Sequence, residues 1–280
     1  MLHCGAIGCP ALHFYYVKIP SVATRGTQSI ERALVLLREL SARARPGWRL
    51  TDIAERCGLD RGTASRILSC LVRERFAVKR RGDRHYLPGP ALYELGHALP
   101  EMVAFEALCR PALGRLAART RCVAFLYLRS DKDFVCVARE GVDSIKGLSI
   151  EVGTRRALCL SAGGVAMLVA LPAEVRAAVQ AENLRRIRKA GDRRLPAIER
   201  MIRRSEGRGA GVNLGDVVPR ITALSVPICG PGGVPFASLT VSGPSERLPR
   251  DRVEETLVAI EREVRAIEAK ARPALLDLGF

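Results

Sequence analysis

Histidine is scarce in this sequence of 280 residues: there are four, and none lies beyond His97. A Cys–His or Ser–His–Asp nucleophile needs a histidine base, so residues 121–280 cannot supply one. The sequence also has no Walker motif. Its glycine-rich segment 207–215 follows a predicted helix and precedes a predicted strand, the reverse of the order in a dinucleotide fingerprint. We therefore expect no catalytic residues and no cofactor. An enzyme acting on a small carboxylic acid, with a basic accessory domain, stays open as the alternative.

Cysteine is frequent, with nine residues, but no two have CxxC spacing. We therefore expect no metal site. Unpaired cysteines inside apolar segments are typical of core positions and of a reducing compartment, so we expect a cytoplasmic protein. The longest apolar run, GGVAMLVALP, is about half as long as a membrane span, and no membrane partner is expected. Residues 1–24 lack the basic start of a signal peptide and are predicted to be a disordered extension.

Positive charge is abundant. The net charge is +16 and the isoelectric point is about 10.1. Such a balance suits a polyanion such as nucleic acid, or an acidic membrane surface. The excess is spread along the chain, so charge alone does not decide between these partners.

The segment 25–88 has the pattern of three helices and a hairpin. Apolar side chains at helical spacing predict helices over residues 27–43, 52–57 and 61–74. Thr51 and Asp60 are predicted caps for the second and third helices, and Gly58 is predicted to end the second. Two short extended runs around Gly82–Asp83 predict a hairpin. The order is typical of a winged helix-turn-helix DNA-binding domain.

The third helix leaves small polar and basic side chains on its outer face. Arginine can bond guanine, serine and threonine can bond bases or phosphates, and a basic hairpin can reach the backbone or the minor groove. We therefore expect double-stranded promoter DNA as the partner. The predicted DNA-binding residues are Arg49, Thr51, Arg61, Gly62, Thr63, Ser65, Arg66, Ser69, Lys79, Arg80, Arg81 and Arg84. A solvated helical face, or a winged helix that docks a protein, is the alternative interpretation.

The rest of the chain alternates hairpins with helices, which predicts an α+β domain on an antiparallel sheet. A linker helix over 89–109 is predicted to break at Pro100, and Pro111 is predicted to begin the next helix. One helix is predicted from a Ser161 cap through residue 184, re-phased at Pro172. The effector and oligomerisation domain is predicted over 110–272, with a tail at 273–280. Predicted strands cover 122–129, 134–140, 145–153, 221–228 and 234–243, and further helices cover 195–207 and 250–271.

The segment GTRRALCLSAGG leads an extended run into a helix start. Ser161, Ala162, Gly163 and Gly164 would present backbone N–H groups there, which suit a carboxylate. The alternative is an ordinary capped helix with small residues for packing.

In residues 25–272 the sequence resembles the IclR-type bacterial transcription regulators. The resemblance is carried by SIERALVLLREL, LTDIAERCGLDRGTASRILSCL and RHYLPGPALYELG, and then by GTRRALCLSAGGVAMLVALP, ITALSVPI and PFASLTVSGP. It implies two domains of the α+β class: an N-terminal winged helix-turn-helix, then a linker helix and a C-terminal GAF-like effector domain. It also implies a homodimer or tetramer that responds to a small organic acid, in some relatives an aromatic one. A DNA-packaging protein without a ligand is a third possibility.

The resemblance also implies a set of effector-binding residues: Leu148, Leu158, Ala162, Gly163, Gly164, Asp216, Thr240 and Ser242. The sequence departs from the family pattern at Ala157, Cys159 and Val165, where relatives usually have proline, often histidine, and lysine. Arg220 replaces a usual glycine and could be either a carboxylate partner or a surface charge. Neither the effector, nor the operator, nor the sign of regulation follows from the sequence.

Overall fold

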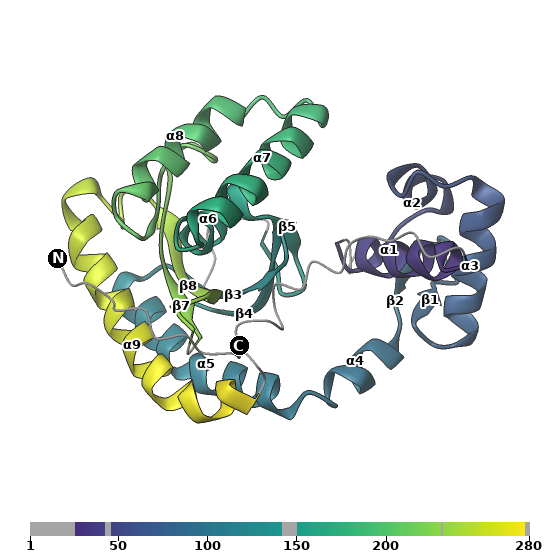
Figure 1. The fold of residues 1–280 in the computed structure, drawn as a ribbon, viewed down its shortest axis with the longest axis horizontal. Coiled ribbons are helices and arrows are strands. Elements are labelled where there is room, and N and C mark those ends of the chain that lie inside the picture. Colours follow the sequence, from purple (N-terminus) through teal and green to yellow (C-terminus); the bar gives the residue numbers. More distant parts are fainter. Residues whose placement is uncertain (1–25, 43–45, 142–149, 231, 278–280) are drawn as a thin grey trace.

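The structure is a computed structural model and describes residues 26–42, 46–141, 150–230 and 232–277. Figure 1 shows a small unit of helices and a hairpin at one end, and a larger unit around a six-stranded sheet at the other. The short helix α4, residues Pro90–Gly96, lies between them. The predicted two-domain α+β class is confirmed.

Three helices and a two-stranded hairpin of the first unit enclose one apolar core. Leu40, Ile53 and Leu68, one from each helix, are fully buried. Trp48 lies at the edge of this core, and its indole N–H donates to the Glu39 carbonyl at 2.8 Å. The elements are α1 (Gln28–Ala42), α2 (Leu50–Arg56), α3 (Arg61–Arg73), β1 (Ala77–Lys79) and β2 (Tyr86–Pro88).

The turn between α2 and α3 has the geometry that the sequence predicts. Gly58 has a φ of +64°, a left-handed conformation that glycine adopts without strain. Asp60 accepts a hydrogen bond from the Thr63 N–H at 2.8 Å, which caps the start of α3. The predicted end of one helix and start of the next are therefore confirmed here.

The predicted Thr51 cap is wrong. The Arg49 carbonyl accepts the Ile53 N–H at 3.1 Å, so α2 already begins at Leu50. Thr51 therefore lies in the first turn, where its hydroxyl donates to the Asp52 carboxylate at 2.8 Å.

The predicted linker helix is interrupted at Pro100, as expected, because α4 ends before Pro100 and α5 (Pro100–Thr120) begins at it. The prediction that a new helix begins at Pro111 is wrong, since α5 runs through it. Pro111 is exposed, while Phe105 and Leu113 on either side are buried in one core. Packing on both sides holds the helix together across the hydrogen bond that proline cannot donate.

The larger unit is built on one antiparallel sheet in the order β5-β4-β3-β8-β7-β6. The predicted hairpins, β3 with β4 and β7 with β8, are confirmed. The central contact joins β3 to β8, with Phe125 opposite Thr240. The strands are β3 (Val123–Ser130), β4 (Asp133–Glu140), β5 (Arg155–Ala157), β6 (Gly211–Leu214), β7 (Ile221–Cys229) and β8 (Pro235–Pro244).

Two strands differ from the prediction. β6, an edge strand, lies in the glycine-rich segment 207–215, for which no strand was predicted. It is held as a strand by pairing with β7, from Gly211 opposite Ser225 to Leu214 opposite Thr222. Most of the strand predicted over 145–153 lies outside the described residues.

Helices cover both faces of the sheet (Figure 1). α5 and α9 pack on one face, and α6, α7 and α8 lie on the other. The predicted helix from Ser161 to residue 184 is two helices, because Pro172 cannot donate the hydrogen bond that would continue α6. The remaining elements are η2 (Leu158–Leu160), α6 (Ala162–Val169), α7 (Ala173–Lys189), α8 (Leu195–Glu206), η3 (Arg250–Arg252) and α9 (Val253–Asp277).

Candidate functional site

The outer face of α3 carries the predicted DNA-binding residues. Ala64, Leu68 and Leu71 point into the core. The opposite side presents short or basic side chains: Arg61, Gly62, Arg66 and Ser69 are exposed, and Thr63 and Ser65 are half-buried. The Arg66 guanidinium donates to the Thr63 hydroxyl at 3.3 Å. Besides the two arginines, these positions carry only glycine, serine and threonine, so the start of α3 presents little side-chain bulk to solvent.

The hairpin beside α3 carries the other basic residues. The side chains of Lys79, Arg81 and Arg84 are exposed. Arg80 differs, because its guanidinium pairs with the Asp83 carboxylate and donates to the Pro46 carbonyl at 3.0 Å.

Arg80 therefore braces the hairpin tip against the chain before Trp48. Its hydrogen bonds hold the pKa of Asp83 well below the usual range. Arg49 and Thr51 are exposed at the start of α2.

A cavity of about 140 Å³ lies in the larger unit, between the sheet and the start of α6. Most of its lining is apolar, with a minority of hydroxyl, amide and guanidinium groups. The lining residues are Phe125, Tyr127, Ile150, Arg156, Leu160, Ser161, Ala162, Arg194, Asn213, Val217, Val218, Ile221, Ala223, Thr240 and Ser242. Of the predicted effector-binding residues, Ala162, Thr240 and Ser242 line this cavity.

The start of α6 is closed by its own cap. The Ser161 hydroxyl accepts the Gly164 N–H at 3.0 Å, so that N–H is not available to a ligand. Of the four predicted cradle residues, only Ser161 and Ala162 line the cavity.

The two glycines serve close packing. A Cβ on Gly163 would lie 2.2 Å from the Tyr127 ring, and a Cβ on Gly164 would lie 2.1 Å from the Leu158 carbonyl. Glycine at these positions lets α6 approach β3 and η2. Leu158 itself is fully buried and does not line the cavity, and Leu148 lies outside the described residues.

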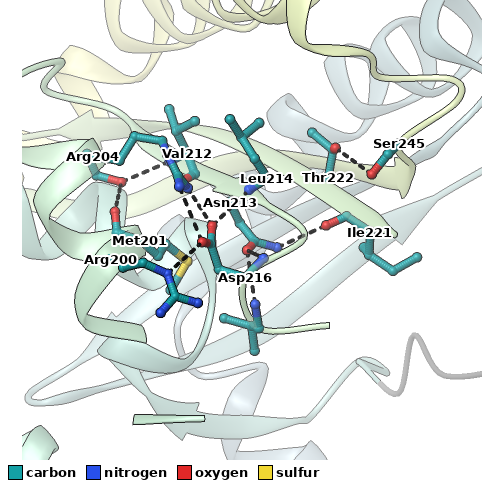
Figure 2. Close-up of polar contacts among 12 residues, drawn as sticks. Arg200, Met201, Arg204, Val212, Asn213, Leu214, Asp216, Ile221, Thr222 and Ser245 are labelled. Carbon is teal, nitrogen blue, oxygen red and sulfur yellow. Dashed lines mark hydrogen bonds and ion pairs between the residues drawn. The ribbon is translucent and has the colours of Figure 1, made fainter. Parts of the chain in front are cut away.

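Asp216 lies in an ion-pair network (Figure 2) and is not a lining residue of the cavity. Its carboxylate pairs with Arg204 and lies 3.8 Å from Arg200 on α8, and it accepts the Leu214 N–H at 3.1 Å. Burial raises the pKa of Asp216, but the hydrogen bonds from Arg204 and Leu214 outweigh it, so the pKa lies below its usual value. Asp216 therefore ties the loop after β6 to α8.

Asn213 on β6 lines the cavity and was not among the predicted site residues; its side chain bonds the loop that follows (Figure 2). Its side-chain oxygen accepts the N–H groups of Asp216 at 3.0 Å and Val217 at 3.2 Å. Its amide nitrogen donates to the Ile221 carbonyl at 3.2 Å. These three bonds fix the loop that brings Val217 and Val218 to the cavity. The local sequence signal for this loop was the turn-forming stretch Asn–Leu–Gly–Asp at residues 213–216.

The hydroxyl groups on β7 and β8 form a chain. Thr240 donates to the Ser225 hydroxyl at 2.9 Å, and Ser225 donates to the Leu239 carbonyl at 2.8 Å. The proton of the Thr240 hydroxyl is thus committed, which leaves its oxygen lone pairs to accept from a ligand.

Two cationic side chains, Arg156 and Arg194, line the cavity and were not predicted. Burial lowers the pKa of Arg156 and the charge of Arg194 lowers it further, against an opposing effect of Tyr127. Arg220, which the sequence left open as a carboxylate partner or a surface charge, is not part of this cavity. It is exposed, pairs with Glu246 at 2.7 Å and does not line the cavity, so it is a surface charge.

The thiols of the larger unit are unsuited to nucleophilic chemistry. Burial raises the pKa of both Cys136 and Cys159 to about 12, so each is a neutral thiol at pH 7. Within the described part of the chain, no three His, Cys, Asp or Glu side chains gather in a way that could hold a metal ion. No helix in those ranges is long and apolar enough to cross a membrane.

Two family models match the chain, in the order of its two units. The IclR helix-turn-helix domain matches residues 29–81, and the bacterial transcriptional regulator IclR C-terminal domain matches residues 101–269. The chain belongs to the IclR family. The resemblance stated from the sequence is therefore confirmed, and the protein is a helix-turn-helix transcriptional regulator of that family.

Individual relatives agree with the IclR assignment. The HTH-type transcriptional regulator BhcR of Paracoccus denitrificans is 25% identical over 250 residues, which cover 89% of this chain and 88% of BhcR. An IclR transcriptional regulator from Silicibacter sp. TM1040 shares the fold with a TM-score of 0.70 at 20% identity, over 87% of this chain and 96% of that one. An IclR homologue from Microbacterium hydrocarbonoxydans, complexed with 4-hydroxybenzoate, has a TM-score of 0.64 at 22% identity, over 87% of this chain and 98% of that one.

Proposed function

We propose that the protein binds promoter DNA through α3 and the β1–β2 hairpin, and that a small organic acid in the cavity of its larger domain controls this binding. The observation that carries the proposal is the cavity itself. Its charged lining residues are both arginines, and its walls are apolar. A volume of about 140 Å³ is close to that of a cavity known to hold benzene, roughly 150 Å³. The IclR homologue complexed with 4-hydroxybenzoate supports an acid of that size.

The predicted contacts fall into two groups. Residues at the start of α3 would contact base edges, as in other helix-turn-helix proteins. Exposed basic side chains of the hairpin would contact phosphates or the minor groove. The proposed base-contacting set is Arg61, Gly62, Thr63, Ser65, Arg66 and Ser69, and the proposed backbone set is Arg49, Thr51, Lys79, Arg81 and Arg84. Because Arg80 is braced by Asp83, we assign it to the shape of the hairpin.

The proposed effector-contacting residues are those predicted residues that line the cavity: Ala162, Thr240 and Ser242. Gly163, Gly164, Leu158 and Asp216 would act on the ligand through packing or loop position, as their contacts indicate. The buried neutral thiols favour binding over catalysis in this cavity, so we propose a sensor and no enzyme.

We further propose that the protein works as a homodimer or tetramer in the cytoplasm, where promoter DNA lies. Exposed apolar side chains support self-association. Ile30 and Leu34 are 59% and 48% exposed on α1, and Tyr93 is 73% exposed on α4. Two α3 helices in one dimer would contact two half-sites. An acid that binds one relative arrangement of these helices better than another shifts the population between them.

Binding to the DNA upstream of its own gene tests this function. We expect fluorescence anisotropy at moderate ionic strength to give tighter binding to that DNA than to a scrambled duplex. We also expect at least one acid, with 4-hydroxybenzoate tried first, to change the affinity. Equal affinity for both duplexes, with and without every acid of a carboxylate panel, would contradict the proposal.

A further inference from the structure

Two positive side chains from different elements line the same cavity. Arg156 belongs to the edge strand β5, and Arg194 belongs to the turn between α7 and α8. No aspartate or glutamate is among the lining residues of the described chain. A guanidinium has five donors in a planar fork that matches a carboxylate, so two of them at one small cavity favour an anion.

The environment of Arg156 makes an anion more favourable. Burial lowers the pKa of Arg156, and the nearby charge of Arg194 lowers it further. Because both guanidinium groups are cationic, a negative group in the cavity would interact favourably with each of them.

Arg194 already has an internal anion. Its guanidinium bonds both carboxylate oxygens of Asp192, from Nε at 3.0 Å and from Nη2 at 2.7 Å. The Arg194 backbone N–H donates to the same carboxylate at 2.9 Å. Asp192 is not a lining residue, and the Arg194 side chain is 45% exposed. A ligand carboxylate would therefore compete with Asp192 for part of this guanidinium.

We propose that Arg156 and Arg194 form a clamp for one ligand carboxylate, and that Asp192 weakens ligand binding by competing for Arg194. The clamp makes the cavity selective for monocarboxylic acids with a small apolar body over neutral molecules of the same shape. Phe125, Ile150 and Leu160 provide the apolar walls for that body. This inference rests on the proposed function, because it assigns the selectivity of the same cavity.

Matched acid and amide pairs test the clamp on the full-length protein. Isothermal titration calorimetry would compare benzoate, 4-hydroxybenzoate, 3-methylbutanoate and pyruvate with their amides. A charge-assisted hydrogen bond lost from a buried site costs about ten- to a hundredfold in affinity. We expect Arg156→Met to weaken binding of the preferred acid by this factor and to leave the amide unchanged. Arg156→Lys keeps the charge and should recover part of the loss.

Substitution of Asp192 should have the opposite effect on acid affinity. Asp192→Asn keeps an oxygen for the Arg194 N–H and removes the competing charge, so we expect the acid to bind about two- to tenfold more tightly. Arg194→Met should also weaken acid binding. The control is Arg220→Met, which removes an exposed arginine that pairs with Glu246 away from the cavity.

The outcomes separate the two proposals. If no acid of the panel binds, the proposed small-acid sensor is contradicted and the clamp with it. If acids bind but Arg156→Met, with unchanged melting temperature, binds them as tightly as the parent, the clamp alone is overturned. Equal affinity for acid and amide in the parent also overturns it, and weaker acid binding by Asp192→Asn overturns the competing role of Asp192.

Discussion

Helix α3 presents its proposed contact residues from one stretch, residues 61–69, whereas the cavity takes its lining from segments spread between Phe125 and Ser242. On α3 the contact residues point to solvent, and few tertiary contacts restrain them. Around the cavity, several lining residues make tertiary contacts: Thr240 bonds Ser225 on β7, and Asn213 bonds the Ile221 carbonyl. We therefore expect substitutions on the outer face of α3 to change the affinity for DNA without changing stability. Substitutions around the cavity should change both the affinity for the effector and the stability of the domain.

The largest effect is expected at Gly164. A Cβ there would lie 2.1 Å from the Leu158 carbonyl, so Gly164→Ala must push α6 away from η2. We expect the free energy of unfolding in urea to fall by about 3 kcal/mol. Gly114→Ala is the control, because a Cβ at Gly114 on α5 meets nothing within 4 Å. That change should stabilise the helix by about 0.5–1 kcal/mol, and an equal loss in both variants would argue against close packing at Gly164.

An intermediate effect is expected at Arg66, in DNA affinity alone. If its exposed guanidinium contacts a base, Arg66→Ala should weaken binding to the specific site by about 2 kcal/mol and leave the melting temperature unchanged. Fluorescence anisotropy with the upstream DNA measures this. Arg73→Ala, at the far end of the same helix, is the matched control. Parent-like affinity of Arg66→Ala for that DNA would remove Arg66 from the proposed contacts.

The smallest effect is expected at Asp216, and it depends on pH. Since the pKa of Asp216 in the folded state lies below its ordinary value of 3.8, the ionised carboxylate stabilises the fold above pH 3.8. This stabilisation is lost as the pH falls through the lower folded-state pKa. Asp216→Asn should cost about 1 kcal/mol at pH 7, and its difference from the parent should shrink below pH 3.8.

Urea unfolding of the parent and of Asp216→Asn at several pH values measures that difference. A direct ligand contact predicts another result: acid binding would change while stability stayed at the parent value. That outcome would contradict the network of Arg204, Leu214 and Asp216 as the main role of this carboxylate.

Local signals in the sequence placed the turn between α2 and α3 correctly. Gly58 and Asp60 end one helix and start the next through their own backbone and side-chain chemistry, so no distant residue is needed. The same holds for the Ser161 cap and for the three predicted hairpins. Pro111 and Thr51 were misplaced because packing and an upstream carbonyl, neither visible in a short window, extended the helices.

The sequence by itself determined the helix-turn-helix, the two hairpins of the larger unit and the family, because each depends on patterns within a few tens of residues. The tertiary structure alone decided which side chains share the cavity. Arg156, Arg194 and Asn213 come from an edge strand, a turn and a second edge strand, and only the antiparallel sheet and its covering helices bring them together. The same packing directed Asp216 toward Arg204, since a partly buried carboxylate is stable only beside a cation or hydrogen-bond donors.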